Sequence, residues 1–311
     1  MQSLKTMLYE LDGPVARISL NRPERGNGIT FDMPRELAWC VEQADLDPRV
    51  HVIALSGRGK GFCGGYDLVL SAETLMEDDT EQNSIINEDE LPENSPLSKT
   101  VQMKNHTPGE TWDPMIDYQM MSRNMKGFMS LFYANKPVVC KVHGFCVAGG
   151  TDMALCSDLL VIADDAKIGY PPARVWGSPT TSLWAYRIGI EKAKRLLFTG
   201  DCLNGTEAVE WGLAIEHAPA DKLDERFEIL VQRIAKMPVN QLIMMKLLIN
   251  QTITNAGLHS TQVIGTMFDG ITRHTKEGYA FQQKAFTRGF KDAVRERDTP
   301  FGDPGSSTFK G

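Results

Sequence analysis

Two glycine-rich turns each follow directly on an apolar, strand-like segment of the chain. The first turn, residues 57–68 (GRGKGFCGGYDL), follows residues 50–56 (VHVIALS), and the second, Ala148-Gly149-Gly150, follows residues 138–144 (VVCKVHG). Short apolar runs bounded by glycine are typical of buried strands in a parallel sheet. The carboxyl ends of such strands share one edge, where ligands bind. The turns therefore predict one site built from two distant parts of the chain.

Strand-like and helical segments alternate through the first half of the chain. Apolar alternation or short apolar runs mark residues 15–20 and 159–163 as strands, and helical spacing of apolar residues marks residues 32–44 and 115–134 as helices. From Glu191 onward the pattern is helical. This order predicts an α/β fold with a mostly parallel sheet, followed by a helical region.

Composition excludes several other classes of protein. The 311 residues are 42% hydrophobic and 23% charged, which is typical of a globular chain. No apolar stretch approaches the about 18 residues of a membrane span, and the first residues lack the apolar segment of a signal peptide. We therefore expect a cytoplasmic protein. The six cysteines form no CxxC pair, which favours buried thiols over disulfides or a metal site.

The negative charge is concentrated in one segment. The whole chain has a formal charge of −7, but residues 71–100 carry nine acidic residues and one basic residue, Lys99, a net charge of −8 that leaves +1 for the rest. A nearly neutral body argues against a nucleic-acid surface. Low apolar density over residues 71–114 predicts an irregular insertion. Its acidic part is either a solvated loop or an interaction module.

Two glycine turns at one sheet edge can direct backbone N–H groups at a single oxygen atom. Glycine permits close backbone approach, and amides at a helix N-terminus carry partial positive charge. Such a pair of donors is an oxyanion hole, which stabilises negative charge that develops during a reaction. Taken singly, each turn is also compatible with an ordinary loop.

The motifs around both turns resemble those of the crotonase (enoyl-CoA hydratase/isomerase) superfamily. In chain order they are Leu20-Asn21-Arg22-Pro23, Gly61-Phe62-Cys63-Gly64-Gly65-Tyr66-Asp67-Leu68, Lys136-Pro137-Val138-Val139, Val142-His143-Gly144-Phe145-Cys146-Val147-Ala148-Gly149-Gly150, Asp158, and Thr199-Gly200 with Ala208 and Gly212. The resemblance covers about residues 5–255. It implies a spiral of ββα units, a homotrimer or dimer of trimers, and an acyl-CoA or enoyl-CoA substrate in fatty-acid or lipid metabolism. It implies no permanently bound cofactor, since coenzyme A is part of the substrate.

The resemblance and the patterns together divide the chain into three parts. We predict an acyl-CoA-binding core over residues 1–215, with the insertion at about 71–114, and a C-terminal helical region for trimerisation over residues 216–297. The remaining residues, 298–311, are rich in Gly, Pro and Ser, which predicts a flexible tail.

The resemblance also implies which residues form the oxyanion hole. The backbone N–H groups of Tyr66 and Gly149 would bind the thioester oxygen, with Gly65 and Gly150 beside them as substrate-binding residues. Two such donors stabilise an enolate more than the ground-state carbonyl, so they accelerate its formation.

Further substrate-binding candidates flank these turns. Arg22 and Arg25 lie in the loop that contacts the coenzyme A nucleotide in the family, and a guanidinium group suits phosphate because it donates two charge-assisted hydrogen bonds. Either arginine could instead be a solvated loop charge. Tyr170 and Trp176 are candidates for the acyl pocket, although each could equally be a core residue.

The chain departs from the family at its acid/base residues. Family hydratases use two glutamates, and the alignment of motifs places Asp152 at the first position and Pro172 at the second. Proline cannot transfer a proton, so the sequence does not support hydration by two carboxylates. Asp152 alone could still move an α- or γ-proton, as in isomerisation, if burial raises its pKa. It could also only cap its helix.

Other groups could replace the missing glutamate, and their spacing does not choose among them. The candidates are Glu110, Asp113, His106, Tyr66, Tyr170, Arg174 and Trp176. His143 is expected to be structural. The sequence therefore predicts an acyl-CoA lyase or isomerase. The alternative is a non-catalytic acyl-CoA binding or delivery protein, which needs the glycine turns but no acid/base pair.

Overall fold

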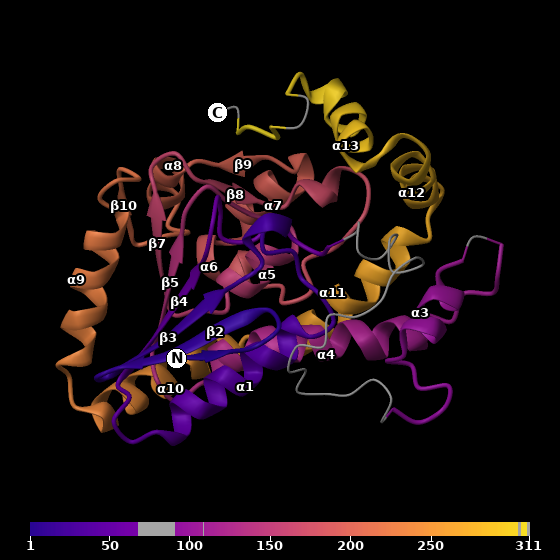
Figure 1. The fold of residues 1–311 in the computed structure, drawn as a ribbon. Coiled ribbons are helices and arrows are strands. Elements are labelled where there is room, and N and C mark those ends of the chain that lie inside the picture. Colours follow the sequence, from indigo (N-terminus) through magenta and orange to yellow (C-terminus); the bar gives the residue numbers. More distant parts are fainter. Residues whose placement is uncertain (68–90, 108, 304–305, 310–311) are drawn as a thin grey trace.

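The strands of the main sheet lie side by side in the order β1-β2-β3-β4-β5-β7-β10 (Figure 1). The structure is a computed structural model that describes residues 1–67, 91–107, 109–303 and 306–309. The strands are β1 (Gln2–Ser3), β2 (Met7–Asp12), β3 (Val15–Leu20), β4 (Val52–Gly57), β5 (Val138–Val142), β7 (Leu159–Ala163) and β10 (Glu216–Ala218). From β3 to β10 all neighbours are parallel, whereas β1, β2 and β3 pair antiparallel. The predicted mostly parallel sheet is confirmed.

A smaller sheet leads from the main sheet to the second glycine turn. It consists of β6 (Phe145–Val147), β8 (Lys167–Gly169) and β9 (Cys202–Leu203). Gly144 makes the bend between β5 and β6 with a φ of +58°, and a Cβ atom there would collide with the carbonyl oxygen of Lys60. Only glycine fits this bend, which brings β6 and the turn after it against the first glycine turn.

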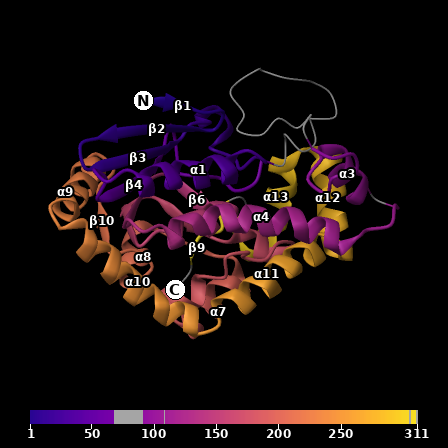
Figure 2. The same ribbon diagram turned by 90° about the horizontal axis from the view of Figure 1, so that it is seen from below.

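Helices cover the sheet and connect its strands. Figure 2 shows α4 (Pro114–Tyr133) lying between α1 (Met33–Leu46) and α11 (Leu258–Arg273), and α4 packs against both. The helix α9 (Leu223–Ala235) packs along β3, β4, β5, β7 and β10. The shorter helices are α5 (Gly149–Ala154), α6 (Trp184–Ile188), α7 (Ile190–Thr199) and α8 (Gly205–Glu210), with 3-10 turns at Pro23–Arg25, Pro171–Arg174 and Thr299–Phe301.

The C-terminal helical region is α10 (Val239–Asn255), α11, α12 (Lys276–Arg288) and α13 (Phe290–Asp298). Within it, α11 reverses the usual pattern of an amphipathic helix. Its buried face carries the polar residues Gln262, Thr266 and Asp269, whereas its exposed face is apolar: Ile264, Met267, Phe268 and Ile271. A polar helix face that is buried inside a protein requires polar partners there.

The insertion predicted at residues 71–114 contains a short helix in its described part. Residues 71–90 lie outside the described residues. The helix α3 (Lys99–Asn105) begins where the Ser98 hydroxyl accepts a hydrogen bond from the Val101 amide at 3.2 Å, and it packs against α4. The irregular structure expected for residues 91–114 is therefore wrong at α3, because a serine N-cap and contact with α4 stabilise a helix despite the low apolar density.

The residues after Arg297, for which a flexible tail was predicted, make contacts with the core. The Cys202 amide donates to the Ser307 carbonyl at 2.6 Å, and the Phe309 amide donates to the Cys202 carbonyl at 2.9 Å. These bonds align residues 307–309 with β9. The side chain of Ser307 is buried.

None of the helices in the described part of the chain is long and apolar enough to cross a membrane. All six cysteines are buried free thiols, as the sequence predicted.

Candidate active site

The two glycine turns lie in direct contact. The Val147 amide donates to the Cys63 carbonyl at 3.1 Å, which joins the segment entering the second turn to the first turn. Gly65 has a φ of +95°, and a Cβ atom on it would lie 2.8 Å from the Cβ of Ala148. A Cβ atom on Gly149 would lie 2.9 Å from the ring of Tyr66. The close approach predicted for these two turns therefore depends on glycine in both.

The amides of Tyr66 and Gly149 have no hydrogen-bond acceptor among the described residues. Ile29 pairs with the first turn through bonds from its amide to the Gly65 carbonyl, at 2.8 Å, and from the Asp67 amide to its own carbonyl, at 3.0 Å. Neither of these two hydrogen bonds uses the Tyr66 amide as a donor. Gly149 is the first residue of α5, where an amide has no acceptor within the helix. In the described part of the chain both N–H groups thus lack an acceptor, as a pair of oxyanion donors requires.

Asp152 lies one turn into α5 and is 1% exposed. Its Oδ1 accepts hydrogen bonds from the amide of Thr181 at 3.1 Å and from the Thr181 hydroxyl at 2.9 Å. Its partners are thus in another segment, and its carboxylate does not cap α5, which has no side-chain capping bond at its N-cap residue, Ala148. The pKa of Asp152 is raised to about 7, mainly because the carboxyl group is buried. The hydrogen bonds from Thr181 lower this pKa, and the negative charge of Asp269 raises it. A carboxyl group that titrates near neutrality suits proton transfer.

The raised pKa of Asp152 predicts how stability depends on pH. The folded protein holds the proton up to about pH 7, whereas the unfolded chain loses it near the ordinary value of 3.8. The folded state binds more protons in that interval, so its free energy of unfolding falls as pH rises and levels off above about pH 7. We expect Asp152→Asn to remove this loss and to be about 2–4 kcal/mol more stable than the parent at pH 8.

Urea unfolding of parent and variant at pH 4, 6 and 8 measures this difference. Near pH 4 the two proteins should differ little in stability, because this is close to the ordinary value of 3.8 and the unfolded parent has released only part of its Asp152 protons. A difference that stays constant from pH 4 to pH 8 would contradict the raised pKa.

Two tyrosines and a second aspartate surround Asp152. Burial raises the pKa of Tyr66 and of Tyr170 well above 10, and the charges of Asp152 and Asp269 raise both further. A Cβ atom on Gly177 would lie 3.4 Å from the Tyr170 hydroxyl and 3.7 Å from Oδ1 of Asp269. The two carboxylates and two phenols therefore share one buried, polar region beside the glycine turns.

Asp269 comes from the buried face of α11, and a chain of charged groups continues from it. Its Oδ2 forms an ion pair with Nη1 of Arg273 at 3.3 Å. Nη2 of Arg273 donates to both carboxylate oxygens of Asp117, at 2.7 and 2.8 Å. Nε2 of His106 lies 3.4 Å from Oδ1 of Asp117, and the His106 ring stacks on His274. Among the replacement candidates in the insertion, His106 thus connects to this region.

The other candidates of the insertion lie elsewhere. Asp113 is the N-cap of α4, where its side chain accepts from the Met115 amide at 2.8 Å, and Glu110 is exposed. Burial disfavours ionisation of Asp117, but hydrogen bonds and charges from His106 and Arg273 outweigh it and lower the pKa of Asp117.

The arginines proposed to bind phosphate lie next to Asp67. Nη1 of Arg22 donates to the Gly28 carbonyl at 2.6 Å, and its Nη2 donates to Asp67 at 3.0 Å. The side chain of Arg25 is 32% exposed, against 14% for Arg22, and its Nε lies 3.4 Å from Asp67. Arg22 therefore supports the loop, while Arg25 is the more accessible of the two cations.

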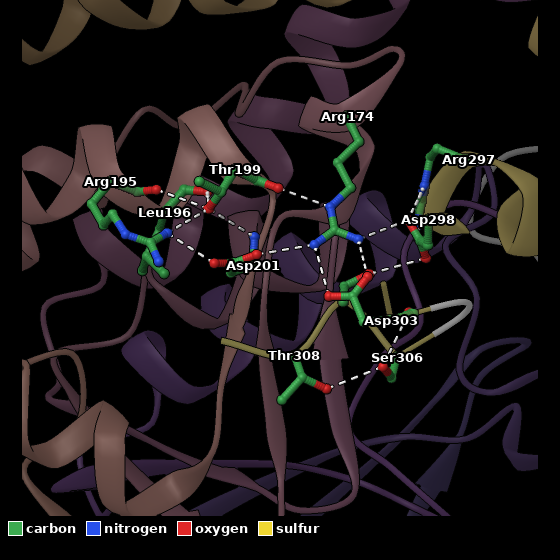
Figure 3. A network of polar contacts seen from close by, with 11 residues as sticks. Arg174, Arg195, Leu196, Thr199, Asp201, Arg297, Asp298, Asp303, Ser306 and Thr308 are labelled. Carbon is green, nitrogen blue, oxygen red and sulfur yellow. Dashed lines mark hydrogen bonds and ion pairs between the residues drawn. The ribbon is translucent and has the colours of Figure 1, made fainter. Parts of the chain in front are cut away.

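Arg174, which the sequence suggested as a residue of the acyl pocket, takes part in a network of ion pairs with the C-terminal residues (Figure 3). Its side chain is 0% exposed, and it forms ion pairs with Asp201 at 3.0 Å, Asp298 at 3.0 Å and Asp303 at 2.8 Å. Its Nε donates to the Thr199 carbonyl at 2.8 Å. Arg174 therefore binds the C-terminal tail to the core.

Two further candidates have structural partners. Trp176 packs on Phe281 of α12, with ring centroids 5.0 Å apart. Nε2 of His143 lies 2.9 Å from the Gly59 carbonyl, in agreement with the structural role expected for it.

The sequence analysis missed Asp269, Arg273 and Asp117. Spacing gives no signal for them, because they lie on helices far from both glycine turns in the chain. One signal was present: the polar residues Gln262, Thr266, Asp269 and Arg273 recur at helical spacing, which marks one face of a helix. Nothing in the sequence shows that this face is the buried one.

Comparisons relate the chain to known proteins. A family model described as enoyl-CoA hydratase/isomerase matches residues 10–91 and 110–289. The chain is 26% identical to 1,2-epoxyphenylacetyl-CoA isomerase of Escherichia coli, over 81% of this chain and 84% of the relative. It is 28% identical to hydroxycinnamoyl-CoA hydratase-lyase of Pseudomonas fluorescens, over 76% and 75%. A crystal structure of an enoyl-CoA hydratase from Mycobacterium smegmatis is 54% identical, with a TM-score of 0.88 over 98% of this chain and 97% of that one.

Proposed function

The chain belongs to the enoyl-CoA hydratase/isomerase family, and on that premise we propose that it moves a proton along the acyl chain of a coenzyme A thioester. The family model matches most of the chain, and the M. smegmatis structure confirms the predicted crotonase-like α/β fold. The chain is therefore an acyl-CoA enzyme of the hydratase, isomerase or lyase type. Isomerisation of an enoyl thioester is the finer assignment that we propose.

The proposed chemistry begins at the oxyanion hole. The amides of Tyr66 and Gly149 would donate hydrogen bonds to the thioester oxygen, and these bonds strengthen as the carbonyl becomes an enolate. Removal of an α-proton then becomes feasible for a carboxyl group of modest basicity. Coenzyme A enters as part of the substrate, and no permanent cofactor has a step in this scheme.

The proposal rests mainly on the burial and the raised pKa of Asp152. It is buried one helical turn after Gly149, and its pKa of about 7 lets it hold and release a proton at neutral pH. Family hydration needs a second glutamate, and Pro172 stands in that position. The absence of this second glutamate also favours one alternative function, a non-catalytic protein that binds or delivers acyl-CoA.

A panel of coenzyme A thioesters tests the proposal. Saturated, 2-enoyl and 3-enoyl thioesters of several chain lengths are mixed with the protein; calorimetry measures binding, and chromatography with mass spectrometry measures products. Conversion of a 3-enoyl to a 2-enoyl thioester is the expected result. Binding without any conversion would favour the delivery protein. Absence of binding, with free coenzyme A as the control, would show that the thioester assignment is wrong.

Gly65→Ala is expected to lower kcat about 10²–10³-fold on the thioester that the parent converts. Alanine is strained at a φ of +95°, and its Cβ would lie 2.8 Å from that of Ala148. The turn must shift, and the Tyr66 amide moves with it. Gly64→Ala is the matched control, because a Cβ atom there meets only ordinary contacts, the nearest at 3.5 Å. Equal kcat values for the two variants would exclude the Tyr66 amide as an oxyanion donor.

We also propose that the nucleotide of coenzyme A contacts Arg25 and that chains associate through their C-terminal helices into a trimer or dimer of trimers. Arg25 is the more exposed arginine of its loop. The faces that support association carry exposed apolar side chains of α10 and α11: Met244, Met245, Leu247, Leu248, Ile249, Ile264, Met267, Phe268 and Ile271. Large exposed apolar faces are typical of subunit interfaces.

A further inference from the structure

We propose that Asp269 of α11 supplies the second carboxylate of this active site, in place of the glutamate that is missing at Pro172, and takes the α-proton of the thioester. The inference rests on the proposed function, because it names the base for the same proton transfer. It assigns Asp152 to the second half of the reaction, in which a proton is delivered to the acyl chain.

The loop after Pro172 places both aspartates around one region. The amide of Ser178 donates to Oδ1 of Asp269 at 3.3 Å, and three residues later Thr181 donates to Asp152 at 3.1 Å from its amide. Nε2 of Gln262, on the same face of α11 as Asp269, donates to the Thr181 carbonyl at 3.1 Å. This loop, which carries no carboxylate of its own, thus fixes one from α5 and one from α11.

The surroundings of the two carboxylates differ in charge. Asp269 has Arg273 at 3.3 Å, and a neighbouring cation favours the ionised form. Asp152 accepts hydrogen bonds from uncharged Thr181 groups. The pKa of both aspartates is raised above its ordinary value, chiefly by burial. For Asp269 the charge of Arg273 opposes this rise, whereas for Asp152 the groups that oppose it are the hydrogen bonds from Thr181 and the Thr180 backbone. Paired groups with such different environments divide into base and acid.

Several buried polar atoms in this region have no hydrogen-bond partner among the described residues. They are Oγ1 of Thr180, Oγ1 of Thr266 and Nε1 of Trp112. Thr180 precedes the residue that binds Asp152, and Thr266 lies on the same face of α11 as Asp269. Unpaired buried polar groups are rare and costly in folded proteins. Their concentration here indicates that a polar ligand group or water meets them, as a reaction site requires.

The proton balance of an enoyl isomerisation fits this pair. The Asp269 carboxylate takes a proton from Cα of a 3-enoyl thioester, and the electron pair of the C–H bond moves into the dienolate held at the oxyanion hole. The neutral carboxyl group of Asp152 then gives its proton to Cγ, and a double bond forms between Cα and Cβ. Asp269 ends protonated and Asp152 ionised. Transfer of one proton from Asp269 to Asp152, directly or through solvent, restores the starting state.

The proposal is tested by exchange of α-protons in D₂O. Octanoyl-CoA, a saturated thioester, has α-protons to lose but no double bond to move, so exchange needs the oxyanion hole and a base only. Mass spectrometry follows deuterium uptake in the parent, Asp269→Asn and Asp152→Asn. We expect Asp269→Asn to lower the exchange rate about 10²–10⁴-fold while thioester binding stays within a few-fold. Asp152→Asn should retain exchange within about tenfold but lose isomerisation of a 3-enoyl thioester.

The pH profile of exchange separates a catalytic from a structural role. The parent rate should rise with pH as the base ionises, and this rise should be absent from the residual rate of Asp269→Asn. Because interacting groups titrate together, the midpoint belongs to the whole cluster. His106→Gln, a control for titration at the outer end of the cluster, should keep the rise. Among the described residues, the charged and titratable groups that act on Asp269 or respond to its charge include Arg273, Asp117, His106, Asp152, Tyr66 and Tyr170.

Two control variants distinguish the loss of a catalytic base at Asp269 from a loss of stability or folding. Asp158→Asn removes another buried carboxylate, paired with Lys246 at 2.8 Å outside this cluster, and should keep the parent pH profile even if it is less stable. If Asp269→Asn does not fold, Asp269→Glu keeps a carboxylate and should exchange more slowly with the pH-dependent rise retained. Exchange by Asp269→Asn within threefold of the parent would overturn the assignment of Asp269 alone. A parent that binds octanoyl-CoA without exchange would overturn the proposed function as well.

Discussion

Replacing Asp152 by asparagine is expected to lower isomerisation of an enoyl thioester by about 10²–10⁴-fold, the usual loss when a general acid or base is removed. Asparagine has nearly the same shape and can accept the same hydrogen bonds from Thr181, at 2.9 and 3.1 Å, so the local structure should survive. Its amide cannot deliver a proton. Steady-state kinetics should show the loss in kcat, and calorimetry should show thioester binding within a few-fold of the parent.

Asp152→Glu completes this experiment. The added methylene keeps a titratable group but moves it by about 1 Å, a displacement that can cost around a hundredfold in rate. Activity between those of the parent and Asp152→Asn is therefore expected. If Asp152→Asn instead turns over at the parent rate, the residue is only a structural partner of Thr181.

Replacing Arg174 by methionine is expected to cost about 3–5 kcal/mol of stability, because it removes the buried cation that three carboxylates share. Asp201 and Asp298 keep Arg195 and Arg297 as partners, so the largest loss falls on Asp303. The guanidinium group is 0% exposed and pairs with Asp201, Asp298 and Asp303, whose side chains are 9%, 0% and 5% exposed (Figure 3). Its carbon atom also lies 4.0 Å from the ring centroid of Phe301, which adds a cation–π contact. Urea unfolding measures the loss, and limited proteolysis should show earlier cleavage near residue 300.

Arg195→Met is the matched control for this prediction. Arg195 pairs with the same Asp201 at 2.8 Å, but its side chain is 38% exposed. An exposed ion pair is worth about 0–1 kcal/mol, so its loss should change stability little. Equal losses for the two variants would mean that burial of the Arg174 network is not what stabilises the tail.

Much of the fold could be predicted from local patterns. The strand at residues 15–20 and the strand at 159–163 have the predicted bounds, and the helix predicted at 115–134 is α4, Pro114–Tyr133. These elements are signalled by the period of their apolar residues, which depends only on neighbours in the chain. The helix α3 was missed because its stability comes from packing on α4, which local periodicity does not register.

The candidate site could be predicted only in part. Glycine is needed at Gly65 and Gly149 because of local geometry and close approach, so the two turns were visible as motifs before their contact was known. The position of Asp152 followed from the second turn. Arg174 looked like a pocket residue because it follows Pro172, but its side chain turns to Asp298 and Asp303, far along the chain.

The sequence by itself determined the parallel α/β architecture and the glycine turns, because each depends on residues that are neighbours in the chain. The resemblance to the crotonase superfamily added the departure from two glutamates at Pro172. The tertiary structure alone decided which face of α11 is buried. Periodicity shows that Gln262, Thr266 and Asp269 share a face opposite to Ile264 and Phe268, and burial of the apolar face would be the ordinary expectation. Here the polar face is buried, because Gln262 and Asp269 meet hydrogen-bond donors and acceptors on the loop after Pro172. That pairing brings a second carboxylate to Asp152, and only long-range packing can specify it.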